Sequence, residues 1–211
     1  MIVYGDLLQQ FDHEKSGRDN LGLGRWTYMK LNSDNNTTTQ VICGYSPCAN
    51  KKKDSGTVYQ QHCRHLINKL NDNTCPRVRF REDLLCKMIQ WRRKKERLIL
   101  CLDASKNIYR GELGRELTDL HGLGMKDIVE EFTARKLGAT YFRGSVRINA
   151  IWATSDVTVA NACVMPVGYA VGDHCRFVVD FATALLVGTG CVQKIIQPAL
   201  CRLNTRIKGC A

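Results

Sequence analysis

One short apolar run, Leu98 to Leu102, constrains the fold more than any other stretch of this sequence. It lies in the segment 97–107, is too short for a typical helix, and ends abruptly on Asp103. This pattern predicts a strand that is buried on both faces of a sheet. A carboxylate just beyond the carboxyl end of such a strand is placed to hold a metal or polarise a water, so Asp103 is the first candidate site residue. The alternative is that Asp103 caps the turn that follows.

The composition predicts one folded unit in an intracellular protein, nuclear or cytoplasmic. A chain of 211 residues with 44% hydrophobic content can bury one sizeable core. Residues 1–10 lack the features of a secretory signal, and polar residues interrupt the apolar stretch 177–200, so no membrane partner is expected. The eleven cysteines are odd in number and scattered, with Cys101 and Cys163 inside apolar runs, as in a reducing compartment.

The clearest possible metal framework from cysteines and histidines lacks the paired close spacing of zinc sites. Its members are Cys43, Cys48, His62, Cys63 and His65.

The net charge of +11 indicates an anionic partner, with DNA or RNA as the first choice. Much of this charge lies in two clusters, Lys51, Lys52, Lys53 and Arg92, Arg93, Lys94, Lys95. The alternative is a solvated loop and a solvated helix end, because cations near a helix C-terminus are stabilised by the helix dipole without any ligand.

The apolar spacing along the chain predicts an α+β fold in layers. Alternation predicts strands at 25–31 and 39–44 around a polar hairpin loop, and helical spacing predicts helices from Tyr59 to Leu70 and from Phe80 to Trp91. Short helical turns are expected at 112–120 and 127–136, the second capped by Gly138, and further strands at 146–153, 157–164 and 177–181.

Four landmarks occur in a fixed order, each at a strand end or in a loop: Tyr45 with Pro47, Asp103, the segment 147–149, and Asp173 with His174. In this order they resemble the later part of the endonuclease/exonuclease/phosphatase superfamily. Residues 22–26 and 148–154 make the chain most similar to the domain carried by reverse-transcriptase-encoding mobile elements. The resemblance implies a four-layer αββα sandwich, here incomplete, over residues 1–181, with 182–211 as a tail of unknown role.

The resemblance also implies roles for the landmark residues. Asp103 would position or deprotonate the attacking water, and His174 would bond the phosphate and stabilise its developing charge. Asp173 would sit beside the metal as a ligand, with Mg²⁺ as the cofactor, and Tyr45 would hydrogen-bond a phosphate oxygen without adding charge. Cleavage of a phosphodiester needs these three elements: a nucleophilic water, a cation and donors for the transition-state charge.

Two positions depart from the family's pattern. Ser105 stands where the family has an asparagine and is too short to reach the same oxygen or water, while Asn107 is displaced along the loop. Asn149 stands where the family has a carboxylate beside the histidine. A neutral amide can hold an imidazole in place and yet fix the wrong tautomer, an effect worth about 10⁴ in rate in the serine-protease triad.

The family's first half, with the glutamate that anchors the metal, would precede residues 17–24. The sequence is therefore interpreted as a truncated, degenerate remnant of a magnesium-dependent nucleic-acid phosphodiesterase, weak or inactive as it stands. Loss of one packed sheet would expose apolar surface, which a partner or a dimer could cover. The alternatives are a non-catalytic basic module that binds DNA or RNA, and a gene fragment without function.

Overall fold

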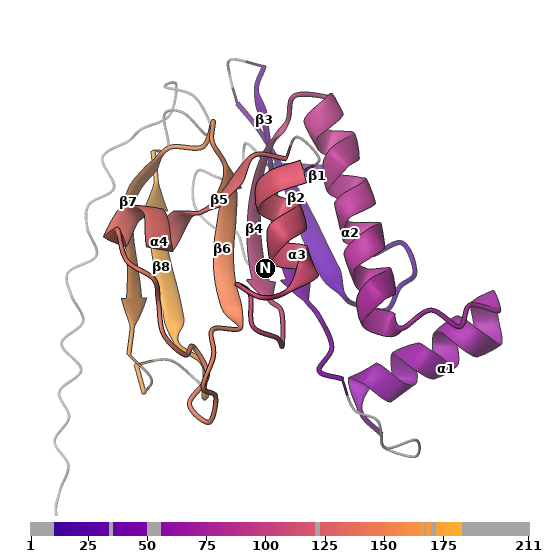
Figure 1. Cartoon of the computed structure of the whole chain (residues 1–211). Helices are drawn as coiled ribbons and strands as arrows, with labels where there is room; N and C mark the ends of the chain where they lie inside the picture. The colour runs from indigo at the N-terminus through magenta and orange to yellow at the C-terminus, as the bar shows by residue number, and fades with distance from the viewer. Residues whose placement is uncertain are drawn as a thin grey trace, which may run out of the picture.

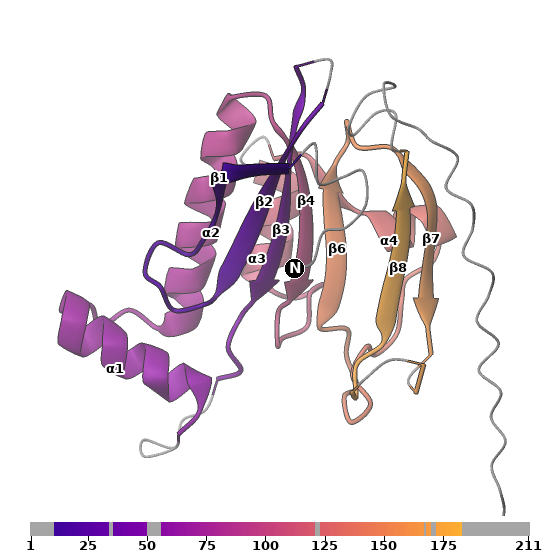
Figure 2. The same ribbon diagram turned by 180° about the vertical axis from the view of Figure 1, so that it is seen from behind.

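The computed structural model describes residues 11–33, 36–49, 56–120, 123–166, 168–169 and 172–182, and its centre is a six-stranded sheet. The strand order is β1-β2-β3-β4-β6-β5, with β3 and β4 parallel and the other neighbours antiparallel (Figures 1 and 2). The bounds are β1 Phe11–Arg18, β2 Trp26–Asn32, β3 Thr38–Tyr45, β4 Arg97–Asp103, β5 Met125–Asp127 and β6 Asn149–Thr154. A separate antiparallel pair consists of β7 Val159–Met165 and β8 Arg176–Phe181.

Two consecutive helices connect β3 to β4, which is what allows these strands to run parallel. Helix α1, Val58–Leu70, begins after Thr57, whose side chain accepts a hydrogen bond from the Gln60 N–H, and ends at Asn71 in the left-handed region. Helix α2, Pro76–Arg93, begins with proline, whose missing N–H costs nothing there. The later helices are short: α3 Glu112–Arg115, a π-helical turn Glu116–Leu120, and α4 Ile128–Thr133.

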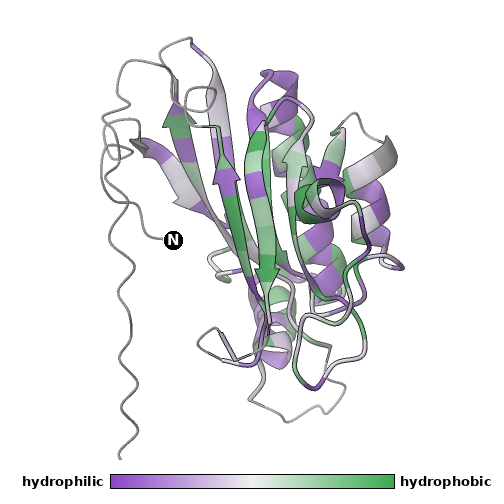
Figure 3. Ribbon diagram, turned by 90° about the vertical axis from the view of Figure 1, so that its left-hand side faces the viewer, coloured by the Kyte–Doolittle hydropathy of each residue, from purple (hydrophilic) through white to green (hydrophobic). Residues whose placement is uncertain are grey.

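The main core lies between the six-stranded sheet and helix α2. Leu98, Leu100 and Leu102 alternate along β4 and join one buried cluster with Phe80 and Met88 of α2. The alternation places every second side chain of β4 on this face. In Figure 1 α2 and α3 cover this side of the sheet, and hydrophobic residues run along the strands in Figure 3.

A second apolar cluster lies on the opposite face of the sheet, against α4 and the β7–β8 pair. Ile99 of β4 and Ala153 of β6 contribute from the sheet, Val129 from α4 and Ala162 from β7, with Phe177 of β8 packed beside them. The predicted α+β class is therefore confirmed. The four-layer sandwich remains a prediction.

Several local expectations differ from the structure. Strand β6 begins at Asn149 rather than at residue 146, and β5 was not expected, since its three residues are held by pairing with β6. The cap of α4 is Ala134 in the left-handed conformation, not Gly138. The segment 182–211 and the cluster Lys51 to Lys53 lie outside the described residues, apart from residue 182. Within the described ranges, no helix is long and apolar enough to cross a bilayer.

A buried ion pair fixes the turn between β1 and β2. Arg25 Nε lies 2.5 Å from Asp19 Oδ2, and Arg25 Nη2 lies 2.8 Å from Asp83 of α2. Both Arg25 and Asp19 are buried. Burial alone would raise the pKa of Asp19, but hydrogen bonds from Arg25 and from the Leu21 N–H outweigh it and lower the pKa below its ordinary value. Asp19 and Arg25 are therefore both charged, and Arg25 connects the turn to α2 through Asp83.

Replacement of Asp19 by asparagine is expected to lower the free energy of unfolding by about 3–5 kcal/mol at neutral pH, because a buried guanidinium loses a carboxylate. Since the folded state lowers the pKa of Asp19, its stabilising contribution is present above the unfolded-chain pKa of about 3.9 and is lost as the pH falls through the lower folded value. Urea unfolding of both proteins should therefore give converging energies below about pH 4.

The matched control for this prediction is Glu131→Gln, which breaks the exposed ion pair with Lys126. This change is expected to cost less than about 1 kcal/mol, as for other exposed pairs. An equal cost for the two variants, or no convergence in acid, would contradict the assignment.

Candidate functional site

Four of the residues singled out from the sequence lie in a row across one end of the large sheet. Tyr45 at the end of β3 pairs in register with Asp103 at the end of β4, and Asp103 pairs with Asn149 at the start of β6. Asn149 in turn is hydrogen-bonded to His174, which comes from the loop before β8. Directly paired residues project from the same face of a sheet, so the first three share a face. The structure thus brings Tyr45, Asp103, Asn149 and His174 to one edge, and we call them the edge row.

Asp103 organises the loop that follows β4. Its Oδ1 accepts a hydrogen bond from the Ser105 N–H at 3.0 Å, and its carbonyl accepts one from the Ser46 N–H at 2.8 Å. Ser105 has a φ of 46°, in the left-handed region. Arg77 of α2 holds this loop from the other side by donating to the Ala104 carbonyl at 2.9 Å. Asp103 therefore does cap a turn, and among the described residues its second carboxylate oxygen has no hydrogen-bond partner.

Thr140 fixes which way the Asn149 amide points. The Thr140 Oγ1 accepts hydrogen bonds from the N–H groups of Ile148 and Asn149, both at 3.1 Å. Its own hydroxyl proton must then be donated, and its partner is Asn149 Oδ1 at 3.0 Å. This atom is therefore the amide oxygen and not the NH₂ group, an orientation that the hydrogen-bond network assigns.

The orientation of Asn149 decides the tautomer of His174. The Nδ1 atom of His174 lies 2.9 Å from Asn149 Oδ1, which can only accept, so Nδ1 carries a proton and donates it. Nε2 is left facing outward, 3.9 Å from Asp173 Oδ1, and the ring lies against Tyr141. An aspartate at position 149 would select the same tautomer. The wrong tautomer expected from a neutral amide is therefore not what this geometry favours; what the amide lacks is the negative charge.

Arg147 anchors the start of β6 beside this row. Its guanidinium is buried, lies 2.7 Å from Asp127 Oδ2 and 2.6 Å from Glu130 Oε1, and donates through Nε to the Asn149 carbonyl at 3.0 Å. Burial raises the pKa of Asp127, and the charge of Arg147 opposes this rise. Burial by itself would lower the pKa of Arg147, but the hydrogen bond that it donates to the Tyr109 hydroxyl and the negative charge of Asp127 raise it, so the guanidinium stays charged. Arg147 therefore acts on the row by positioning Asn149.

The described basic cluster lies far from the edge row. Arg92 to Lys95 form the end of α2 and the turn into β4, while Asp103 ends that strand of seven residues. At about 3.3 Å per residue the strand separates the two by roughly 20 Å. Arg92 is engaged by the Glu96 carbonyl and by Asp156, whereas the side chains of positions 93–95 are exposed.

The described residues do not fit a complete magnesium site. No group of three or more histidine, cysteine, aspartate or glutamate side chains within the described ranges could hold a metal ion. Asp173 is exposed beside His174, and Asp103 shares one of its oxygens with the Ser105 N–H. Among the described residues, Cys43, Cys48 and the residues at 62, 63 and 65 likewise do not form a group that could hold a zinc ion.

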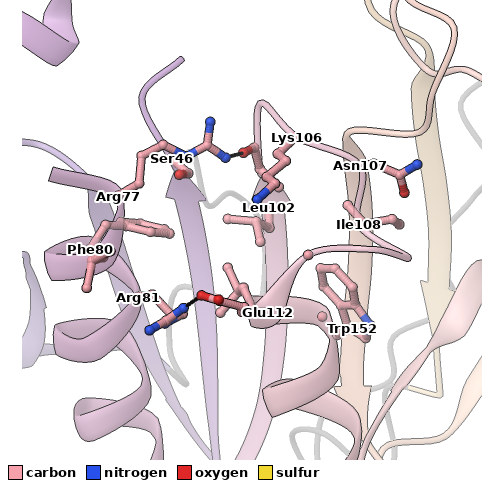
Figure 4. Close-up of a pocket in the computed structure, with 15 residues that line it drawn as sticks. Ser46, Arg77, Phe80, Arg81, Leu102, Lys106, Asn107, Ile108, Glu112 and Trp152 are labelled. Atoms are coloured by element: carbon pink, nitrogen blue, oxygen red, sulfur yellow. Dashed lines mark hydrogen bonds and ion pairs between the residues drawn. The ribbon is translucent and has the colours of Figure 1, made fainter. Parts of the chain in front are cut away.

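A cavity of about 200 Å³ lies on the helix-covered side of the loop after β4 (Figure 4). Phe80, Leu102 and Trp152 form apolar walls, and Lys106 and the ion-paired Arg81 line it as well. Asn107 also lines this cavity and accepts a hydrogen bond from the Tyr109 N–H, so it does not replace the family's asparagine. Leu102 and Ala104 line this cavity, while Asp103 between them belongs to the edge row.

Sequence reasoning missed Thr140 and the partners of Arg147. Thr140 lies nine residues before Asn149 in a segment without periodicity, and its hydroxyl network exists only in the folded chain. Asp127 and Glu130 come from the N-terminus of α4, where acidic residues are favoured by the helix dipole and carry no site signal of their own.

The tautomer of His174 is a measurable consequence of the Thr140 network. In the unmodified chain ¹⁵N-edited NMR should show Nδ1–H at His174, identified among the five histidines by its loss in His174→Gln. Thr140→Val removes the donor that orients Asn149 and is expected to shift the tautomer ratio about fivefold towards Nε2–H, the equivalent of one hydrogen bond of about 1 kcal/mol.

Thr118→Val serves as the control for this measurement, since the Thr118 hydroxyl bonds carbonyls of its own helix. It should leave the His174 signals unchanged. A dominant Nε2–H form in the unmodified chain would show that Asn149 presents its NH₂ group to the ring instead.

Comparison with known proteins gives the fold. No protein-family model and no curated protein matches the sequence. Among solved structures, the catalytic domain of Xenopus laevis APE2 matches with a TM-score of 0.52 and 15% identity, over 75% of this chain and 55% of that one. An endonuclease/exonuclease/phosphatase from Bacteroides vulgatus matches with a TM-score of 0.49 and 12% identity, over 74% and 54% of the two chains. A Neisseria 3′ phosphatase, NExo, bound to a product DNA hairpin, has a TM-score of 0.49 and 12% identity, over 73% and 64%.

The chain spans between half and two thirds of the length of each of these structures. At such low identity the likeness concerns the fold alone. The chain therefore shares an α+β fold with the catalytic domain of Xenopus laevis APE2.

Proposed function

We propose that this chain is the later portion of a magnesium-dependent nucleic-acid phosphodiesterase domain of the mobile-element type, with little or no cleavage as it stands. The observation that carries the proposal is the edge row, in which Tyr45, Asp103, Asn149 and His174 adjoin one another in the order that the resemblance implies. Groups that act on one phosphate must lie within hydrogen-bond reach of it, and in the row side chains from three strands and a loop come together.

Within this proposal each member of the row has a role that its chemistry allows. The free oxygen of Asp103 accepts a proton from a water at the strand end, and the half-exposed Tyr45 hydroxyl donates to a phosphate oxygen. His174 donates from Nε2 when its ring is protonated, since Nδ1 is already engaged by Asn149. Mg²⁺ is the proposed cofactor of the ancestral reaction and Asp173 its proposed ligand in this chain, a single carboxylate where a metal needs several.

The charge at position 149 supports the proposal of weak activity. An imidazolium beside a carboxylate gains a close Coulomb partner, while one beside an amide oxygen gains a dipole. In this proposal the row lacks the negative charge that a carboxylate at position 149 would place beside His174. A partner or a second copy covering the sheet belongs to the same proposal.

The activity test uses supercoiled DNA, which one nick converts to a relaxed form. The purified chain with Mg²⁺ is expected to produce no relaxed DNA above a blank, and Asn149→Asp with Ser105→Asn is not expected to rescue cleavage. These substitutions repair groups that act on a phosphate already polarised by a metal, and they do not supply the missing ligands.

Magnesium-dependent nicking by the unmodified chain would overturn the proposal of weak activity if Asp103→Ala and His174→Ala abolish it. Asp180→Ala, an exposed carboxylate on β8, is the matched control and should retain any such nicking. Nicking that survives all three substitutions would mark a contaminant nuclease.

A non-catalytic nucleic-acid-binding role is the second candidate, supported by the exposed cations at Arg93, Lys94 and Lys95. Such a module would bind phosphates without reading sequence, because it offers charge and no base-reading groups. Lys51 to Lys53 are included in this proposal because of their charge in the sequence, since they lie outside the described residues.

Binding of this kind has a defined dependence on salt. The logarithm of the affinity for duplex DNA should fall linearly with the logarithm of the salt concentration, with a slope of about −0.9 per phosphate neutralised. Alanine at positions 51–53, or at 93–95, should flatten the slope, measured by fluorescence anisotropy. Lys126→Ala is the control, because Lys126 is already paired with Glu131. Equal affinity at low and high salt would mean that the clusters are solvated surface.

A further inference from the structure

Two cysteines face each other on the paired strands that lead into the edge row. Cys43 of β3 and Cys101 of β4 are direct partners in the parallel register, and both are half-buried. Their strand neighbours Ile42 and Leu100 belong to the helix-side core. Because side chains alternate along a strand, both thiols project from the other face of the sheet, away from α2.

The spacing of these strands suits a disulfide. Neighbouring strands lie about 4.8 Å apart, and disulfides join Cα atoms that are about 4.4–6.8 Å apart. The Cα spacing of the pair therefore falls within the range that disulfides join. The spacing is near the short end of that range, where a disulfide is strained and more easily reduced.

The two thiols also influence each other chemically. A hydrogen bond from Cys101 lowers the pKa of Cys43 to about 7, and the same contact raises the pKa of Cys101. The lowered pKa favours the thiolate of Cys43, the form that attacks disulfides, with a protonated thiol beside it. A nucleophilic thiol and a neighbour that resolves the intermediate are the two parts that reversible thiol oxidation needs.

We propose that Cys43 and Cys101 form a reversible disulfide between β3 and β4, with a low-molecular-weight disulfide as the oxidant. The Cys43 thiolate attacks one sulfur of the oxidant, forms a mixed disulfide and releases the first small thiolate. Cys101 then loses its proton to that thiolate and attacks the Cys43 sulfur, which expels the second small thiolate. Two electrons pass from the protein to the oxidant, and two small thiols are produced once the second thiolate takes a proton from water.

The position of this bond gives it a consequence for the edge row. Tyr45 and Asp103 lie two residues beyond Cys43 and Cys101 in the same strands and are themselves paired in register. A covalent link two register pairs earlier would hold the ends of β3 and β4 together, close to the residues of the row. The proposal rests on strand register and thiol chemistry, and it stands whether or not the chain cleaves DNA.

Peptide mapping tests the proposal directly. The full chain is treated with oxidised glutathione near pH 8, blocked with N-ethylmaleimide and digested with trypsin. The expected product is a cross-link between peptides 31–51 and 98–106 that has lost two hydrogen atoms and is cleaved by dithiothreitol. Because peptide 31–51 also contains Cys48, Cys48→Ser is the matched control and should keep the cross-link, whereas Cys43→Ala should lose it.

A second measurement needs no oxidation. Phenylarsine oxide bridges two thiols that lie close together, so the unmodified chain and Cys48→Ser should bind one equivalent at this pair, released by dithiothreitol and not by 2-mercaptoethanol. Cys101→Ala should bind one equivalent fewer. Complete labelling of Cys43 and Cys101 by N-ethylmaleimide after oxidation, or a cross-link that runs through Cys48, would overturn the proposal.

Discussion

The buried guanidinium of Arg147 is the contact on which the edge of this fold depends. It connects three segments that are distant in sequence: Asp127 and Glu130 at the start of α4, Asn149 at the start of β6, and the Phe177 ring of β8, which lies 5.7 Å from the guanidinium carbon. A charge taken out of water costs several kcal/mol unless it is paired and hydrogen-bonded. Two carboxylates and a carbonyl surround the guanidinium, so its burial ties these segments to one another.

The same contact explains why an asparagine can occupy the site position without disordering it. Arg147 holds the Asn149 backbone, and Thr140 holds its side-chain oxygen, so the orientation of His174 is set by groups other than the side-chain charge at 149. The orientation of the His174 ring therefore does not depend on a negative charge at position 149. The proposed loss of activity therefore rests on the neutral side chain at position 149 and on the absence of a group of three metal ligands among the described residues, and not on a collapsed site.

How much of this could be predicted depended on how local the cause was. Strand β4 and helices α1 and α2 were predicted because their apolar spacing is a property of consecutive residues. Strand β5 and the start of β6 were not, because they are set by pairing and by the contacts of Arg147.

The candidate site follows the same rule. Asp103 could be found from its place after an apolar run, while Thr140 has no local pattern and acts only through a network of folded backbone. The pairing of Cys43 with Cys101 is also a matter of register, which two separate strand predictions do not give.

Strand β4 also keeps the two proposed modes of nucleic-acid contact apart. The exposed cations at 93–95 precede its first residue and Asp103 is its last, a separation of roughly 20 Å. Along one strand of duplex DNA, with a charge about every 3.4 Å, this distance corresponds to about six phosphates. Cations so far away cannot neutralise a phosphate held by the edge row. The basic cluster would therefore add affinity for a long nucleic acid without placing a charge beside His174, and the two proposed functions do not depend on each other.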